Sequence, residues 1–249
     1  MHRRWFESHL EKFNLQYKNR SDEFHGLSIA GPKSRELLQK IVRENISNDS
    51  FKFRDSRKMF VAGVPAIVNR ISFTGELGYE IYVAPHFQLK LYEELTKAGK
   101  EFNIKPFGGR ALMSMRLEKN WGAWTLDYRP DFTAKETGLD AFINWNKDFI
   151  GKDSAQKDES KNKLVPLIVE TNDIDVTYNE AVLKGDKSIG YITSGGFEHF
   201  VNKSVAFSYI DQNEIKSDKG IQVEINGDFF NCSIIKEPLY DPTGQKMRS

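Results

Sequence analysis

The stretch ISFTGELGYEIYV at 71–83 places a carboxylate and a phenol where they could recognise a ligand. Two β-like segments flank a turn that contains Gly75 and Gly78. Because alternate residues of a strand face the same side, Glu80 and Tyr82 share one face of the second segment. A carboxylate accepts two parallel hydrogen bonds, so this pair suits the edge of a flat heterocycle with N–H donors. A solvated or salt-bridged glutamate on an edge strand is the alternative, and the spacing alone favours it.

A second group of residues lies in RLEKNWGAW at 116–124, at the predicted end of a helix. Arg116, Glu118 and Lys119 lie beside Trp121 and Trp124, and this helix end could direct the two aromatic rings into a ligand cavity. The other interpretation is a helix end with core tryptophans and surface ion pairs, and the pattern alone favours it.

A glycine-rich stretch, YITSGGF at 191–197, could form a lip over a ligand, and a plain turn between two barrel strands explains it equally well. It has neither a P-loop lysine nor the GxGxxG spacing, so it does not indicate a nucleotide site.

Four acidic residues are crowded into one segment, which is typical of a solvated loop. They are Asp127, Asp131, Glu136 and Asp140.

The spacing gives no support for metal or thiol chemistry. No histidine follows a metal-binding pattern such as HExxH. Cys232, the only cysteine, lies in an apolar run without a nearby catalytic partner, and we expect a small buried side chain. We therefore expect no metal site and no disulfide, and the spacing assigns no catalytic residue. The five histidines that lack a metal-binding spacing are His2, His9, His25, His86 and His199.

Length and charge narrow the class of protein. The 249 residues suffice for one large domain or two small ones. Lys+Arg 36 against Asp+Glu 35 gives a net charge of +1, so we expect no general binding to nucleic acid. No apolar run approaches the roughly 18 residues that cross a bilayer, and the N-terminus lacks the pattern of a signal peptide. The composition indicates a soluble protein of a reducing compartment, and we expect the cytoplasm.

The elements that must position these residues are mixed in an α+β manner. We expect an amphipathic helix over 3–16 that carries Trp5, Phe6, Leu10 and Phe13 on one side. The other predicted elements are strands at 26–31 and 79–84, two β-like segments within 58–73 (KMFVAG and PAIVNRISF), a helix that begins near Pro32, and helices over about 86–102 and 108–119.

The composition changes after FIGK at 149–152. The stretch SAQKDESKNK at 154–163 holds no large apolar side chain and indicates a solvated linker. Short apolar runs separated by turn residues follow, and Asn226-Gly227 between the last two is a strong hairpin signal. We place a boundary near 152–163 and expect a small β-barrel or sandwich after it.

These motifs, in this order, resemble the folate-dependent aminomethyltransferases, a family that includes the T-protein of the glycine cleavage system. The residues that carry the resemblance are SIAGPKSRELLQ, RISFTGELGYEIYV, MRLEKNWGAW, ETGLD and DFIGK. The WGAW tail and the ITSGGF, KSVAFSYI and IIKEPLYDPT stretches are most similar to a subgroup, the C-terminal folate portion of dimethylglycine and sarcosine dehydrogenases and oxidases.

The resemblance implies an incomplete T-protein-like cloverleaf with a folate-binding region over 1–152, followed by a β-barrel domain over 163–249. It implies a tetrahydrofolate whose N5 attacks the one-carbon unit of a methylated, glycine-type amine, giving 5,10-methylenetetrahydrofolate and the demethylated amine. By motif position, the glutamate that contacts the pteridine edge is Glu80. The other candidate cofactor-binding residues are Ile81, Tyr82, Phe73, Arg116 and Trp124.

Three departures from the family pattern bear on function. Phe73 replaces a usual tyrosine, so a hydroxyl is lost. Leu112 occupies the place of a T-protein arginine, with Arg110 offset by two, which favours the dehydrogenase-type subgroup. The chain begins where the family is already well into its first subdomain, and the preceding segment normally carries the aspartate near N5. No residue here takes its place by motif, so the catalytic residue is left unassigned.

We therefore predict a folate-dependent enzyme portion that needs an oligomer or a partner chain for its N-terminal half-site, with FAD only in a partner module. The alternatives are a non-catalytic folate-binding or structural subunit, and a glycine cleavage T-protein. The strand region 58–84 is expected to be partly uncovered and to favour association.

Overall fold

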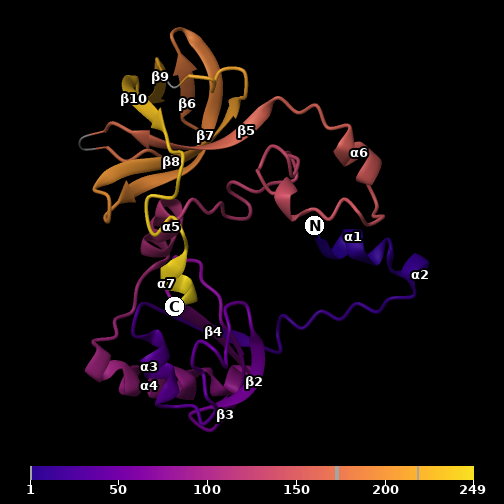
Figure 1. Ribbon diagram of the computed structural model, residues 1–249, viewed down its shortest axis with the longest axis vertical. Coiled ribbons are helices and arrows are strands. Elements are labelled where there is room, and N and C mark those ends of the chain that lie inside the picture. Colours follow the sequence, from indigo (N-terminus) through magenta and orange to yellow (C-terminus); the bar gives the residue numbers. More distant parts are fainter. Residues whose placement is uncertain (1, 172–173, 218) are drawn as a thin grey trace. The chain divides into compact units, whose positions relative to one another are not determined.

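The computed structural model describes residues 2–171, 174–217 and 219–249, and its contacts divide the chain into two compact units (Figure 1). The first unit comprises Met1–Ser72, Glu76–Lys105 and Met247–Ser249. The second comprises Phe73–Gly75 and Pro106–Lys246. Each unit has a hydrophobic core of its own.

The first unit is built on a four-stranded antiparallel sheet with the strand order β1-β4-β3-β2. Alternate residues such as Val68, Tyr79 and Ile81 point to one face and are fully buried there. Leu38 of α3 and Leu91 of α4 pack into the same core, so these two helices cover that face. The elements of this unit are α1 (His2–Glu7), α2 (Leu10–Phe13), β1 (His25–Ala30), α3 (Ser34–Gln39), β2 (Ser56–Val61), β3 (Val64–Asn69), β4 (Gly78–Val83), η1 (Pro85–Phe87), α4 (Gln88–Gly99) and η2 (Lys100–Phe102).

The single helix expected over 3–16 is divided into α1 and α2. At the break, the Ser8 hydroxyl donates to the Trp5 carbonyl at 2.8 Å, and the His9 ring stacks on the Trp5 indole at 4.4 Å. A serine that binds backbone carbonyls competes with helical pairing, which explains the interruption. Neither short helix contributes a residue to a hydrophobic core cluster of the described chain.

The second unit contains a closed six-stranded barrel with the order β10-β5-β8-β7-β6-β9, which settles the expectation of a barrel or sandwich. Asn226 and Gly227 join β9 and β10 with positive φ angles of 54° and 91°, the backbone that a two-residue hairpin requires. Helix α5 packs on the barrel because Leu117 shares a cluster with Val205 and Phe207. The elements are α5 (Gly109–Glu118), η3 (Asp140–Phe142), α6 (Lys152–Gln156), β5 (Asn162–Val169), β6 (Ala181–Lys184), β7 (Lys187–Glu198), β8 (Lys203–Asp211), β9 (Ile221–Ile225) and β10 (Asp228–Ile234). Near the C-terminus, α7 (Gln245–Arg248) begins in this unit, and its residues from Met247 onward are assigned to the first.

Two expectations about this unit are corrected. Residues 191–197 form no turn and no lip, because they lie inside the continuous strand β7. The solvated linker after 152 begins with the short helix α6. Cys232 is buried in β10 as expected, and burial raises the pKa of its thiol to about 12. Within the part of the chain that the structure describes, no helix is long and apolar enough to span a bilayer.

Candidate functional site

Glu80 and Tyr82 lie on the face of the first unit's sheet opposite the core, as the strand period predicted. Both are half-buried, and the Tyr82 hydroxyl donates to Glu80 Oε2 at 2.6 Å. Strand β4 pairs with β1 on one side and β3 on the other, so the alternative of an edge-strand glutamate is wrong. The pair therefore presents a carboxylate of fixed orientation on a partly open sheet surface.

Gly26 of β1 makes room for the Tyr82 ring. The two residues are cross-strand partners, and a Cβ on Gly26 would lie 3.0 Å from Tyr82 Cε1. The hydrogen bond to Glu80, followed by burial, raises the pKa of the Tyr82 phenol to about 12. The phenol thus remains a hydrogen-bond donor to Glu80 across the physiological pH range.

The remaining predicted contacts are distributed over both units. Ile81 follows Glu80 on the same strand, but its side chain is fully buried in the core, so its backbone is the part left to meet a ligand on the Glu80 face. Phe73 is 37% exposed and belongs to the second unit, as do Arg116 and Trp124. Trp124 is 68% exposed and meets Tyr128 edge to face, which corrects the expectation of a core tryptophan.

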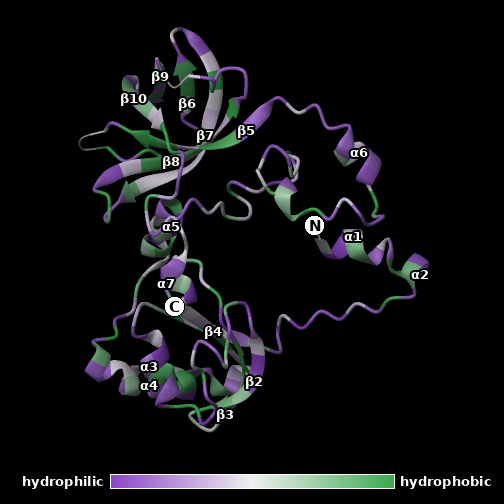
Figure 2. Cartoon of the chain, viewed as in Figure 1, coloured by the Kyte–Doolittle hydropathy of each residue, from purple (hydrophilic) through white to green (hydrophobic). Residues whose placement is uncertain are grey.

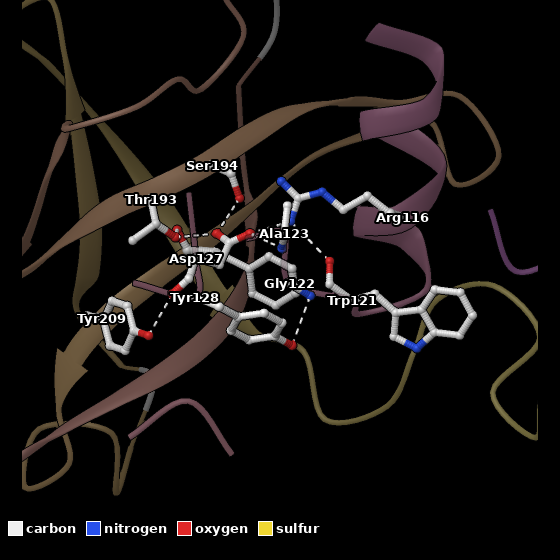
Figure 3. A network of polar contacts seen from close by, with 10 residues as sticks. Arg116, Trp121, Gly122, Ala123, Asp127, Tyr128, Thr193, Ser194 and Tyr209 are labelled. Atoms are coloured by element: carbon white, nitrogen blue, oxygen red, sulfur yellow. Dashed lines mark hydrogen bonds and ion pairs between the residues drawn. The ribbon is translucent and has the colours of Figure 1, made fainter. Parts of the chain in front are cut away.

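Arg116 and Asp127 form a fully buried ion pair at the end of α5 (Figure 3). Arg116 Nη1 donates to Asp127 Oδ2 at 2.5 Å and to the Trp121 carbonyl at 3.0 Å. The Ala123 N–H donates to the same carboxylate oxygen at 2.8 Å. The pair therefore ties the last turn of the helix to the 121–127 loop.

The other oxygen of Asp127 is bound from the barrel. Asp127 Oδ1 accepts hydrogen bonds from the hydroxyls of Thr193 and Ser194, and the Tyr209 hydroxyl donates to the Asp127 backbone carbonyl at 2.7 Å (Figure 3). Neighbouring residues of a regular strand point to opposite faces, but β7 has a register shift between Ile192 and Ser194. This irregularity lets two consecutive hydroxyls reach one carboxylate.

The expectation of a solvated acidic loop holds for Asp131 and Asp140, which are exposed, and is wrong for Asp127, which is fully buried, and for Glu136, which is nearly so. With four donors on its two oxygens, Asp127 has little capacity left to accept a proton from a substrate. Its role is to hold α5, the loop and β7 together. One feature of the sequence indicates this buried network: the adjacent hydroxyl residues Thr193 and Ser194 lie in an otherwise apolar run.

Gly122 in the same loop is needed for packing. A Cβ there would lie 2.4 Å from Tyr128 Cζ, and the Gly122 N–H donates to the Tyr128 hydroxyl at 3.2 Å. We expect Gly122→Ala to displace the Tyr128 ring and to lower the free energy of unfolding by about 1–3 kcal/mol, measured by chemical denaturation. Gly108→Ala is the control, because nothing lies within 4 Å of its added Cβ and its φ is −86°. Equal stability of the two variants would contradict the packing role.

Two further carboxyl groups are buried beside α5. Glu198, the last residue of β7, is completely buried; Ser114 Oγ donates to its Oε2 at 2.8 Å, and its Oε1 has no hydrogen-bond partner. Glu118 accepts the Phe200 N–H at 2.8 Å. Burial raises the pKa of both groups, that of Glu198 to about 8. Among the described residues, no group of three or more His, Cys, Asp or Glu side chains could hold a metal ion.

Comparison with known families defines the class. The chain matches the GCVT N-terminal domain over residues 1–147 and the glycine cleavage T-protein C-terminal barrel domain over residues 162–241. It therefore belongs to the glycine cleavage T-protein family of aminomethyltransferases, which is folate-dependent in general. This confirms the resemblance that the motifs indicated.

Individual relatives show how much of such proteins the chain represents. It is 36% identical over 254 residues to human mitochondrial dimethylglycine dehydrogenase, covering 98% of this chain and 29% of that protein. It is 30% identical over 248 residues to the aminomethyltransferase of Thermoanaerobacter pseudethanolicus, and the match covers 98% of this chain and 67% of that protein. The crystal structure of glycine cleavage system aminomethyltransferase T from Bartonella henselae superposes on this chain with a TM-score of 0.79 at 21% sequence identity. The superposition covers 94% of this chain and 65% of that structure, which shows the same fold.

Proposed function

We propose that this chain binds a reduced folate and takes part in tetrahydrofolate-dependent transfer of a one-carbon unit from a methylated, glycine-type amine, within a dimethylglycine dehydrogenase-like system. The observation that carries the proposal is the oriented carboxylate of Glu80 on the open face of a central strand. The choice of amine is supported by the 36% identity to dimethylglycine dehydrogenase, against 30% to the aminomethyltransferase of Thermoanaerobacter pseudethanolicus.

The residues around Glu80 fit the edge of a pterin. Each carboxylate oxygen has two lone pairs, and Tyr82 uses one of those on Oε2, so both oxygens can still accept hydrogen bonds from a planar pair of N–H donors. On the neighbouring strands, Ser28 and Asn69 are the cross-strand partners of Glu80, and both lie at least partly open to solvent. The face thus combines one charge with small polar neighbours.

Bound folate would supply the nucleophilic nitrogen that takes up the one-carbon unit. The role of Glu80 is to bind and orient the heterocycle, and that of Tyr82 is to hold the carboxylate in place. Ile81 would contribute through its backbone. Phe73 and Trp124 remain predicted contacts, whereas the fully buried Arg116 would act only through the position of the 121–127 loop. No group in the described residues is assigned the role of acid or base.

We also propose that the folate-binding region extends over 1–152, that the barrel domain extends over 163–249, and that the site is completed by a polypeptide with the remainder of the T-protein fold. The length of the relatives supports this, because the matches leave 33% (100 − 67) of an aminomethyltransferase and 71% (100 − 29) of dimethylglycine dehydrogenase outside this chain. An FAD-dependent module would belong to that additional part.

Binding of 5-formyltetrahydrofolate, measured by calorimetry, tests the site. We expect Glu80→Gln to weaken binding at least about tenfold, or roughly 1.4 kcal/mol, because an amide replaces an acceptor-only carboxylate and puts an N–H against the pterin donors. Tyr82→Phe is expected to weaken binding by a smaller factor, since it removes the hydroxyl that orients Glu80 without removing the charge.

Glu93→Gln on the exposed side of α4 is the matched control in the same unit, and we expect no change in affinity. Equal affinities of the wild type, Glu80→Gln and Glu93→Gln would contradict the pterin site. Binding at Glu80 without one-carbon transfer in the completed protein would favour the non-catalytic alternative.

A further inference from the structure

The segment 142–150 of the second unit exposes four large apolar side chains within nine residues. Phe142 is 82% exposed, Ile150 55%, Phe149 38% and Trp145 36%. The rings of Trp145 and Phe149 lie beside each other, with 6.0 Å between their centroids. We refer to these four residues as the 142–150 surface. Apolar side chains concentrated in this way commonly mark a contact with another polypeptide.

The backbone of this segment is also unpaired with any strand of the described chain. Residues 143–151 lie between η3 and α6 and form no helix or strand. Their described backbone hydrogen bonds close short turns, such as Lys147 N–H to the Asn144 carbonyl at 3.1 Å.

A hollow of about 660 Å³ adjoins the segment. Ile143, Trp145 and Ala155 line it, together with the charged residues Lys135, Asp140 and Asp158. It therefore combines an apolar wall with charges of both signs, which suits a polypeptide that brings an apolar side chain flanked by polar groups.

The length of the relatives indicates which polypeptide would cover the 142–150 surface. The superposition on the Bartonella henselae structure covers 94% of this chain but 65% of that one, so 35% (100 − 65) of a protein with the same fold lies outside the shared part. A compact protein buries such a third against the rest of its chain. The barrel and sheet cores of this chain are filled by its own residues, whereas the 142–150 surface is not covered.

The first unit also has a group of exposed apolar side chains. Its helices α1 and α2 and the residues after them expose apolar side chains and contribute none to a described core cluster. Figure 2 shows hydrophobic positions on both short helices. The residues are Trp5, Phe6, Phe13, Leu15 and Tyr17, between 40% and 62% exposed.

We infer that the 142–150 surface and its hollow are the docking site for a polypeptide that carries the third of the T-protein fold outside this chain's match. The inference rests on the proposed function in naming the partner that completes the folate site. It goes further in assigning the residues that this partner covers.

The test fuses the unmatched third of the Thermoanaerobacter pseudethanolicus aminomethyltransferase to residues 1–249 through a flexible Gly/Ser linker, which gives an effective concentration in the millimolar range. Hydroxyl-radical labelling with mass spectrometry then reports the exposure of single side chains. We expect labelling of Phe142, Trp145 and Phe149 to fall at least about fivefold in the fusion, while Phe229, 57% exposed on β10, keeps its labelling.

The double variant Phe142→Ser/Phe149→Ser is expected to abolish the protection of Trp145, whereas Phe229→Ser leaves it unchanged. Unchanged labelling of the 142–150 surface in the fusion would overturn the inference. So would a dimer of the unfused chain in which the same residues are protected, because the occupant would then be a second copy. Folate titration of the same fusion separates the two proposals: protection without folate binding contradicts the proposed function alone, and binding without protection contradicts the docking site alone.

Discussion

Asp127→Asn is expected to lower the free energy of unfolding of the second unit by about 3–5 kcal/mol, because it leaves the fully buried guanidinium of Arg116 without a counter-charge. The amide also places an N–H₂ group where the carboxylate receives donors on both oxygens, from Arg116, Ala123, Thr193 and Ser194. At about 2–4 °C per kcal/mol for a chain of this size, the melting temperature should fall by roughly 10 °C in calorimetry or circular dichroism.

Asp131→Asn is the matched control, because its carboxylate is 66% exposed and pairs with Arg129 at 3.3 Å. A surface pair of this kind contributes about 0–1 kcal/mol. The double variant Arg116→Met/Asp127→Asn should be less destabilised than Asp127→Asn alone, since it removes the unpaired buried charge and keeps an acceptor for the two hydroxyls. If Asp127→Asn is no more destabilising than Asp131→Asn, the buried pair does not hold the unit together.

The parts of the structure that the sequence predicts are those determined by short-range patterns. The strand over 79–84 follows from alternation of apolar residues, and the hairpin at Asn226-Gly227 follows from the positive φ angles that these two residues tolerate. The shared face of Glu80 and Tyr82 follows from the same period of two. For these features, neighbours within a few positions supply all the information required.

The Arg116–Asp127 network depends on contacts that no local pattern contains. Two of the donors to Asp127 are 66 and 67 residues away, and both reach it only because one register shift in β7 aligns them. An acidic loop that is solvated and one that is buried have the same composition. Hydropathy does not predict the break between α1 and α2 for a related reason, because the apolar period continues through Ser8 while the Ser8 hydroxyl binds the backbone.

Glu198→Gln is expected to make the second unit more stable than the wild type in alkaline solution by about 2–4 kcal/mol. Burial raises the pKa of Glu198 from 4.5 to about 8, while the hydrogen bond from Ser114 opposes the shift; among nearby charges, Glu118 and Asp175 favour it and Arg116 opposes it. The carboxyl group is therefore protonated in the folded protein at neutral pH, in a place where its Oε1 has no hydrogen-bond partner.

The sign of the pH dependence follows from the two pKa values. Between pH 4.5 and about 8 the folded state binds more protons at Glu198 than the unfolded state does, so the free energy of unfolding falls as the pH rises. The contribution is fully present below pH 4.5 and is lost as the pH rises through about 8. Glu118, whose pKa is also raised by burial, adds to the same trend.

Urea denaturation of both proteins at pH 5, 7 and 9 measures the effect. We expect Glu198→Gln and the wild type to have similar stability at pH 5, where the carboxyl and the amide are both neutral, and to diverge progressively at pH 7 and 9. Glu237→Gln, at an exposed position, should follow the wild type throughout. Parallel stability curves for the wild type and Glu198→Gln would mean that the buried carboxyl ionises in the folded state as easily as in the unfolded one. The unpartnered Oε1 would then have to be hydrated, and the end of β7 would have to open to water at neutral pH.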